Sequence, residues 1–78
     1  MRILDENSDK KLDRVILYLT EDEAKEMKES LEFLLCEQHQ HSHISSESFD
    51  KEVTISIYKN ENLSSFDERS RKLIIYDE

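Results

Sequence analysis

Residues 20–37 read TEDEAKEMKESLEFLLCE, and they decide the fold of this chain. The Thr20 hydroxyl can cap a first helical turn, and Glu23, three residues later, can reach back to the Thr20 amide. Glu21 and Asp22 join Glu23 in placing three acids at the positive end of the helix dipole. The stretch therefore predicts a helix that begins just after Thr20.

The apolar residues of this stretch follow the helical period. They are Ala24, Met27, Leu31, Leu34 and Leu35. Their spacing predicts a single apolar stripe along the helix. Because a helix with one such stripe is not stable alone in water, the rest of the chain must supply the surface that the stripe covers.

Four other segments have the composition of β-strands. Residues 2–4 are short and apolar, and residues 11–19 carry apolar or amphipathic side chains on both faces, which is typical of a central strand. Residues 37–45 are interpreted as a polar strand. Residues 51–58 alternate strictly, with Val53, Ile55 and Ile57 expected to face inward and Thr54, Ser56 and Tyr58 outward.

The last segment, residues 66–75, is predicted to be a helix, because Phe66, Leu73 and Ile74 lie at helical spacing and Ser65 with Glu68 repeats the capping pattern. The whole sequence then predicts an α+β fold of order ββαββα. Short connections favour a four-stranded antiparallel sheet with both helices on one face, in a single domain of residues 1–78.

Composition restricts the function. The chain has 78 residues, and 38% of them are charged, with a formal net charge of -8. Such a charge repels nucleic acid and anionic membranes and attracts a basic protein partner. No long apolar run or basic, apolar leader is present, so we expect no membrane association and a cytoplasmic location. The single cysteine fits that reducing compartment.

Glycine and proline are both absent. Turns must therefore use Asn, Asp and Ser, which tolerate or mimic turn conformations. The absence of glycine also excludes the Gly-rich loops that hold nucleotide phosphates. No serine lies in a nucleophile motif, and a chain of this length has little room for an enclosed active site, so we expect no enzymatic activity.

The segments 17–23, 39–43 and 66–74 carry a resemblance to a type of small bacterial ββαββα domain: an apolar strand ending in Leu-Thr, a Glu-rich helix, a His-rich strand and a terminal helix. The chain also broadly resembles the small acidic immunity proteins that neutralise bacterial toxins. The resemblance implies a cytoplasmic binding protein without catalysis, and it assigns a role to no individual residue.

His39, His41 and His43 are the candidate metal ligands. Histidines two apart on a strand point to the same face, so an adjacent pair can converge on one ion such as zinc, with a carboxylate as a further ligand. The alternative is a solvated polar face without a cofactor, which the neighbouring glutamines and serine favour.

Phe33, Tyr18 and Tyr58 are the candidate partner-binding residues. Phe33 lies nearly opposite Ala24 and Leu31 on the helix, among acids, where an aromatic side chain can anchor a partner. The tyrosines are expected with the histidines on the uncovered sheet face, which also suits a weak homodimer.

Three hypotheses follow for the function. The first is an acidic, non-enzymatic protein-binding domain, in its most specific form an immunity or antitoxin-type inhibitor of a toxin. The second is a metal-binding protein that uses the histidine strand, and the third is a structural homodimer.

Overall fold

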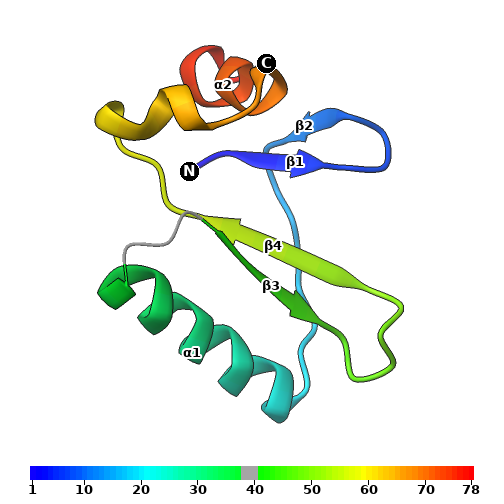
Figure 1. Ribbon diagram of the computed structural model, residues 1–78. Coiled ribbons are helices and arrows are strands. Elements are labelled where there is room, and N and C mark those ends of the chain that lie inside the picture. The colour runs from blue at the N-terminus through cyan, green and yellow to red at the C-terminus, as the bar shows by residue number, and fades with distance from the viewer. Residues whose placement is uncertain (38–40) are drawn as a thin grey trace. The chain divides into compact units, whose positions relative to one another are not determined.

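The structure is a computed structural model that describes residues 1–37 and 41–78. The elements follow the order β1, β2, α1, β3, β4, a 3₁₀-helix and α2 (Figure 1). The chain divides into two compact units. We call Met1–Leu17 with Lys59–Glu78 the end unit, and Tyr18–Tyr58 the middle unit.

The end unit combines a short hairpin with the C-terminal helical segment. Strand β1 (Ile3–Asp5) pairs antiparallel with β2 (Lys10–Leu12). The 3₁₀-helix spans Asn60–Ser65, and α2 spans Glu68–Tyr76. Leu73 on α2 is the buried residue of this unit.

Two arginines tie the two chain ends of the end unit together. Arg2 Nε donates a hydrogen bond to the Leu73 carbonyl at 3.0 Å. Arg69 donates through Nε to Asp9 Oδ1 at 2.9 Å, through Nη2 to the Asp9 carbonyl at 3.2 Å, and through Nη1 to the Glu78 carbonyl at 2.7 Å. These contacts satisfy main-chain carbonyls with charged donors, which form stronger hydrogen bonds than neutral ones.

The turn between β1 and β2 is built without glycine, as the composition predicts. The Asp5 carboxylate accepts from the Asn7 amide at 3.0 Å and from the Ser8 hydroxyl at 2.9 Å, which folds the chain back locally. Asp9 then adopts the left-handed conformation, with φ of 59°. Aspartate tolerates this region better than most non-glycine residues.

Helix α2 has a cap at each end. The Asp67 carboxylate accepts a hydrogen bond from the Ser70 amide, and Asp77 ends the helix in the left-handed conformation. The predicted helix of residues 66–75 is therefore confirmed within two residues. The predicted cap was wrong: Ser65 lies at the end of the 3₁₀-helix, and Asp67 is the residue that caps α2.

The middle unit is a helix packed on a two-stranded ribbon. Helix α1 (Glu21–Glu37) lies against β3 (His41–Ser45), which pairs antiparallel with β4 (Glu52–Ser56). The predicted start of the helix is confirmed. The Thr20 hydroxyl accepts from the Glu23 amide at 3.1 Å, and the Glu23 carboxylate accepts from the Thr20 amide at 2.9 Å.

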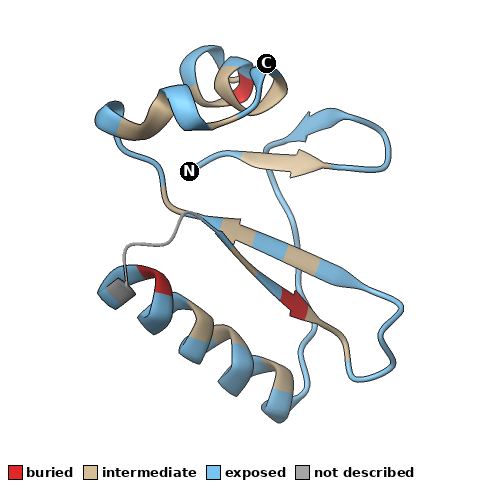
Figure 2. Cartoon of the chain, viewed as in Figure 1, coloured by how far each residue is buried: buried red, intermediate tan, exposed pale blue. Residues whose placement is uncertain are grey.

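The core of the middle unit is small. Leu34 on α1 and Ile44 on β3 are 2% and 3% exposed (Figure 2). Val53, opposite Ile44 in the ladder, is half-buried, as is Ile55, whereas Thr54 and Ser56 are exposed. The predicted inward and outward alternation of residues 53–56 is therefore confirmed.

The packed face of α1 follows the predicted stripe only in part. Met27 and Leu34 are turned inward as predicted, together with Glu23 and Ser30. The other predicted stripe residues are exposed: Ala24, Leu31 at 41% and Leu35 at 71%. The packed face is therefore rotated toward Glu23 and Ser30. The rotation follows from polar contacts at the start of the helix, because Glu23 is used both as a cap and as a contact to the β3–β4 turn, which fixes that side of α1 toward the ribbon.

The prediction of one four-stranded sheet with both helices on one face was wrong. The structure contains two separate two-stranded antiparallel sheets, β1 with β2 and β3 with β4. The error lies in residues 11–19, which were predicted to form a long central strand. Strand β2 ends at Leu12, and residues 13–20 have no regular secondary structure. Ile16 and Tyr18 in this segment are 73% and 90% exposed.

The physical reason is that β-propensity expresses how well side chains fit a pleated surface with neighbouring strands. Each hairpin of this chain pairs only within itself in the described residues, so residues 13–20 have no ladder to join. In the third predicted strand, residues 37–45, Glu37 belongs to α1 and His41–Ser45 form β3, while residues 38–40 lie outside the described residues. The fourth, residues 51–58, shortens to Glu52–Ser56.

Candidate functional site

Helix α1 carries a row of acids that ends in an aromatic residue. Asp22, Glu26, Glu29 and Phe33 follow at spacings of four, three and four residues, so they lie along one side of the helix. All four are exposed, and Phe33 is 46% exposed. In the described part of the chain, the three carboxylates form no ion pair with a lysine or arginine. We call these four residues the acidic stripe.

The neighbouring side of α1 is neutralised locally. Lys25 Nζ lies 3.8 Å from Glu21 Oε1, and Lys28 Nζ lies 3.9 Å from Glu32 Oε1. Both are exposed i, i+4 pairs of the kind that stabilises a helix by about 0.3–0.5 kcal/mol. The two lysines of α1 thus form their ion pairs with Glu21 and Glu32, and within the described residues neither pairs with an acid of the acidic stripe.

Charge is distributed unequally between the two units. Residues 18–58 contain ten acidic and three basic residues, a formal charge of -7. Residues 1–17 and 59–78 together contain nine acidic and eight basic residues, a formal charge of -1. Nearly all of the net charge of -8 therefore belongs to the middle unit, and half of that unit's acids lie in the first three turns of α1.

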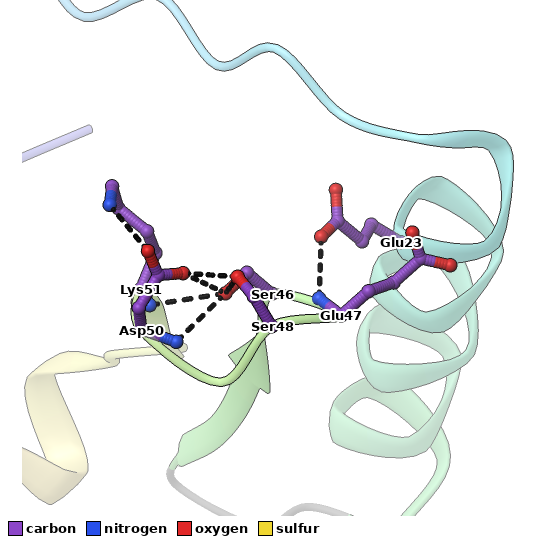
Figure 3. A network of polar contacts seen from close by, with 6 residues as sticks. All are labelled: Glu23, Ser46, Glu47, Ser48, Asp50 and Lys51. Atoms are coloured by element: carbon purple, nitrogen blue, oxygen red, sulfur yellow. Dashed lines mark hydrogen bonds and ion pairs between the residues drawn. The ribbon is translucent and has the colours of Figure 1, made fainter.

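The turn between β3 and β4 is fixed by a network of serine and carboxylate contacts (Figure 3). The Ser46 hydroxyl donates to Asp50 Oδ1 at 2.9 Å and accepts from the Lys51 amide at 3.1 Å, while Ser48 also donates to Asp50. Phe49 adopts a φ of 59°, in the left-handed region that usually favours glycine. The serines and Asp50 hold this strained turn where the sequence offers no glycine.

The same turn is attached to the start of α1. The Glu47 amide donates to Glu23 Oε2 at 2.9 Å, as Figure 3 shows. Hydrogen bonds from the Thr20 amide and the Glu47 amide lower the pKa of the Glu23 carboxyl. Hydrogen bonds from Ser48 and Ser46 lower the pKa of Asp50 well below its usual range. Among the described residues, these contacts join Ser46 and Ser48 to Asp50, and no histidine takes part in them.

Two of the three candidate metal ligands lie together. His41 and His43 are both exposed on the side of β3 that faces away from α1, and their ring centres are 5.2 Å apart. His39 lies outside the described residues. Across residues 1–37 and 41–78, no group of three or more His, Cys, Asp or Glu side chains is arranged to hold a metal ion. The described residues therefore place His41 and His43 together, and the three-histidine set stays a prediction.

Sequence reasoning missed the partner of His43. Glu52 Oε1 lies 2.8 Å from His43 Nδ1, and Thr54 Oγ1 lies 2.7 Å from the same nitrogen. The ladder register explains the contact, since His43 pairs with Thr54 and Glu52 is the next residue on the same face of β4. The alternation of residues 51–58 places Glu52 and Thr54 on one face of the strand, so it predicts this contact once the pairing of the two strands is known.

The candidate partner-binding residues have different settings. Phe33 lies on α1 at the end of the acidic stripe, as expected from its helical angle. Tyr58 follows the end of β4 and is 40% exposed. Tyr18 was predicted to share a sheet face with Tyr58, but it belongs to no strand. Both tyrosines therefore lie outside the strands, and of the predicted patch the β3–β4 face holds His41, His43, Thr54 and Ser56.

The end unit has an open pocket of about 480 Å³. It is lined by Asp9, Lys10, Lys11, Arg69, Lys72 and Glu78. Its cations are partly engaged already, because Arg69 binds Asp9 and Glu78, and Lys11 Nζ lies 3.3 Å from Asp13 Oδ1 and 3.8 Å from Asp77 Oδ2. This arrangement stabilises the chain ends.

The described residues form a small α+β protein with an acidic helix, and none of their helices is long and apolar enough to cross a bilayer. Comparison of the chain with protein-family models, with curated proteins and with solved structures gives no match. The site must therefore be interpreted from its own geometry.

Proposed function

We propose that this chain is a non-enzymatic, cytoplasmic protein-binding domain that engages a basic partner through the acidic stripe of α1. The observation that carries the proposal is the contrast between adjacent sides of α1. The acids at positions 21 and 32 are paired with lysines, whereas Asp22, Glu26 and Glu29 are exposed and form no ion pair with a lysine or arginine among the described residues. An uncompensated row of carboxylates attracts a cationic surface and orients it before contact.

Phe33 supplies the apolar part of this proposed interface. Charged residues at the rim of an interface govern association rate and salt dependence, while buried aromatic anchors supply much of the affinity. Phe33 lies on the same side of α1 as the three acids and exposes 46% of its surface. A partner that places an apolar pocket beside a row of lysines or arginines would cover both features at once.

The most specific form of the proposal is an immunity protein that inhibits a toxin. A toxin that cleaves or binds nucleic acid must present a basic surface to its substrate, and an acidic protein can block that surface by binding it. The charge of -7 on the middle unit suits this role.

Co-expression tests the inhibitor hypothesis. When the product of the adjacent gene is expressed alone in bacteria, we expect it to arrest their growth. Co-expression of this chain should restore growth. A Glu26→Lys/Glu29→Lys variant should fail to protect. The matched Glu21→Lys/Glu32→Lys variant has the same net charge but changes the lysine-paired side, and it should still protect. Equal protection by both variants would remove the acidic stripe as the binding site.

A further inference from the structure

The exposed side of β3 presents two imidazoles at a defined distance. His41 and His43 have ring centres 5.2 Å apart and an interplanar angle of 67°. A histidine bound to zinc at about 2.0–2.1 Å has its ring centre about 3.2 Å from the ion, so two such rings at a tetrahedral angle have centres about 5.2 Å apart. The separation in the structure equals that of two ligands on one ion, and both side chains are exposed.

Glu52 and Thr54 engage one ring nitrogen of His43. Glu52 Oε1 lies 2.8 Å and Thr54 Oγ1 2.7 Å from His43 Nδ1. With Nδ1 engaged by these two partners, Nε2 is the nitrogen that can bind an ion. A carboxylate that orients a histidine in this way is a common companion of metal-binding imidazoles, because it fixes the tautomer and makes the ligand nitrogen more basic.

Two imidazoles do not complete a zinc site. Zinc in structural sites takes four ligands, and the described residues contain no group of three metal-binding side chains. The ribbon's outward side carries small or polar residues beside the histidines, namely Thr54 and Ser56, so a second ribbon can approach closely. The same His41 and His43 on a second copy of the chain would supply the two remaining ligands.

We propose that a divalent transition-metal ion, with zinc as the reference case, is bound between two copies of this chain, each contributing His41 and His43, with Glu52 as the positioning residue. The proposed site lies on the β3–β4 ribbon and is independent of the acidic stripe on α1. The ion would also offset part of the repulsion between two chains that each carry a charge of -8. Metal would thus control dimerisation, and a chelator would reverse it.

Sedimentation velocity on the untagged full chain tests this proposal, with ZnCl₂ as the ligand and EDTA as the reversal. We expect a monomer without metal, a dimer with zinc, and a calorimetric stoichiometry of one ion per two chains. Co²⁺ in place of Zn²⁺ should give the intense visible absorption of a tetrahedral site. Binding of one ion per chain without dimerisation, or no binding, would contradict the proposal.

Variants locate the site. His41→Ala and His43→Ala should each abolish zinc-dependent dimerisation while leaving the circular dichroism spectrum unchanged, since both side chains are exposed. Glu52→Gln should weaken zinc binding by about 10- to 100-fold, the usual effect of losing an orienting carboxylate. The control Glu61→Gln removes the same charge in the 3₁₀-helix and should bind zinc normally. Dimerisation that persists without both histidines would place the metal elsewhere.

Discussion

The two units of this protein are stabilised in different ways. The middle unit is one continuous segment, and its core contains a helix residue, Leu34, and a strand residue, Ile44. The end unit is assembled from both chain ends, and long-range hydrogen bonds from Arg2 and Arg69 join them. The middle unit also carries a formal charge of -7, against -1 for the end unit.

This difference implies that the stability of the end unit depends on the folding of the middle unit, whereas the middle unit depends less on the end unit. If the middle unit unfolds, the end unit must close a flexible loop of residues 18–58. Closure of a loop of this length costs about 3 kcal/mol in chain entropy. The middle unit closes no such loop, so it can keep its structure when the chain ends separate.

The largest effect is expected from Leu34→Asp. The side chain is 2% exposed, and an unpaired carboxylate there should unfold the middle unit and, through loop closure, the end unit as well. Amide hydrogen exchange should show lost protection in α1 and in α2. The control Leu35→Asp changes a side chain that is 71% exposed and should alter stability by less than about 0.5 kcal/mol. Retained protection in α2 of the Leu34→Asp variant would disprove the dependence.

A smaller and local effect is expected from Arg69→Ala. It removes hydrogen bonds to Asp9 and to the Glu78 carbonyl, at a cost of about 1–3 kcal/mol to the end unit. Exchange should accelerate in β1, β2 and α2 and stay unchanged in α1. Lys72→Ala, at the same pocket, is the control and should be nearly silent. Equal acceleration in α1 would show that the two units unfold together.

The helix caps allow a direct comparison of the two units. Thr20→Ala removes the cap of α1, and Asp67→Ala removes the cap of α2, each at a cost of about 1 kcal/mol. In amide hydrogen exchange measured at increasing urea concentration, Thr20→Ala should lower protection in both units, but Asp67→Ala should lower it only in the end unit. The reverse pattern would show that the middle unit depends on the end unit.

The smallest effect is expected from acid. The pKa values of Asp5 and Asp67 in the end unit, and of Glu23 and Asp50 in the middle unit, are lowered by hydrogen bonds to their carboxylates. A lowered folded-state pKa gives stability that is present above the unfolded pKa of about 4 and is lost as pH falls through the folded pKa. Urea midpoints should therefore be flat near neutral pH and fall below about pH 4.

A variant assigns part of this acid dependence to the β3–β4 turn. Asp50→Asn keeps the size of the side chain and removes its titration, so the midpoint should fall less steeply with acid than in the parent chain. Asp13→Asn, which changes an exposed carboxylate outside this turn, should leave the slope unchanged. An unchanged slope in Asp50→Asn would mean that other carboxylates dominate.

Local signals in the sequence predicted local structure well. The Thr20 and Glu23 pair located the start of α1, and the alternation of residues 53–56 oriented β4. The rotation of α1 was not predictable, because the contact that fixes it joins Glu23 to the Glu47 amide, 24 residues away. The same is true of residues 13–20: their apolar content suits a strand, but strand formation depends on a pairing partner that no local pattern encodes.

The residues of the candidate site could be predicted from the sequence, but the contacts between them could not. Phe33 and the histidines stand out by residue type, whereas the separation of paired from unpaired acids on α1 depends on side-chain contacts. Glu52 became a partner of His43 only through the register of β3 and β4. Charge counts predicted a negatively charged surface, and the division of the fold into two units assigned nearly all of that charge to the middle unit.

Isothermal titration calorimetry of this chain with the product of the adjacent gene tests most directly whether a partner binds the acidic stripe of α1. The parent chain should bind that product, with an affinity that falls as salt is raised. Glu26→Lys/Glu29→Lys should weaken binding by about 100-fold or more, as repulsion replaces attraction at two positions. Glu21→Lys/Glu32→Lys, with identical net charge, should bind within about threefold of the parent. Equal losses in the two variants would show that net charge alone governs binding, and would contradict a specific acidic stripe.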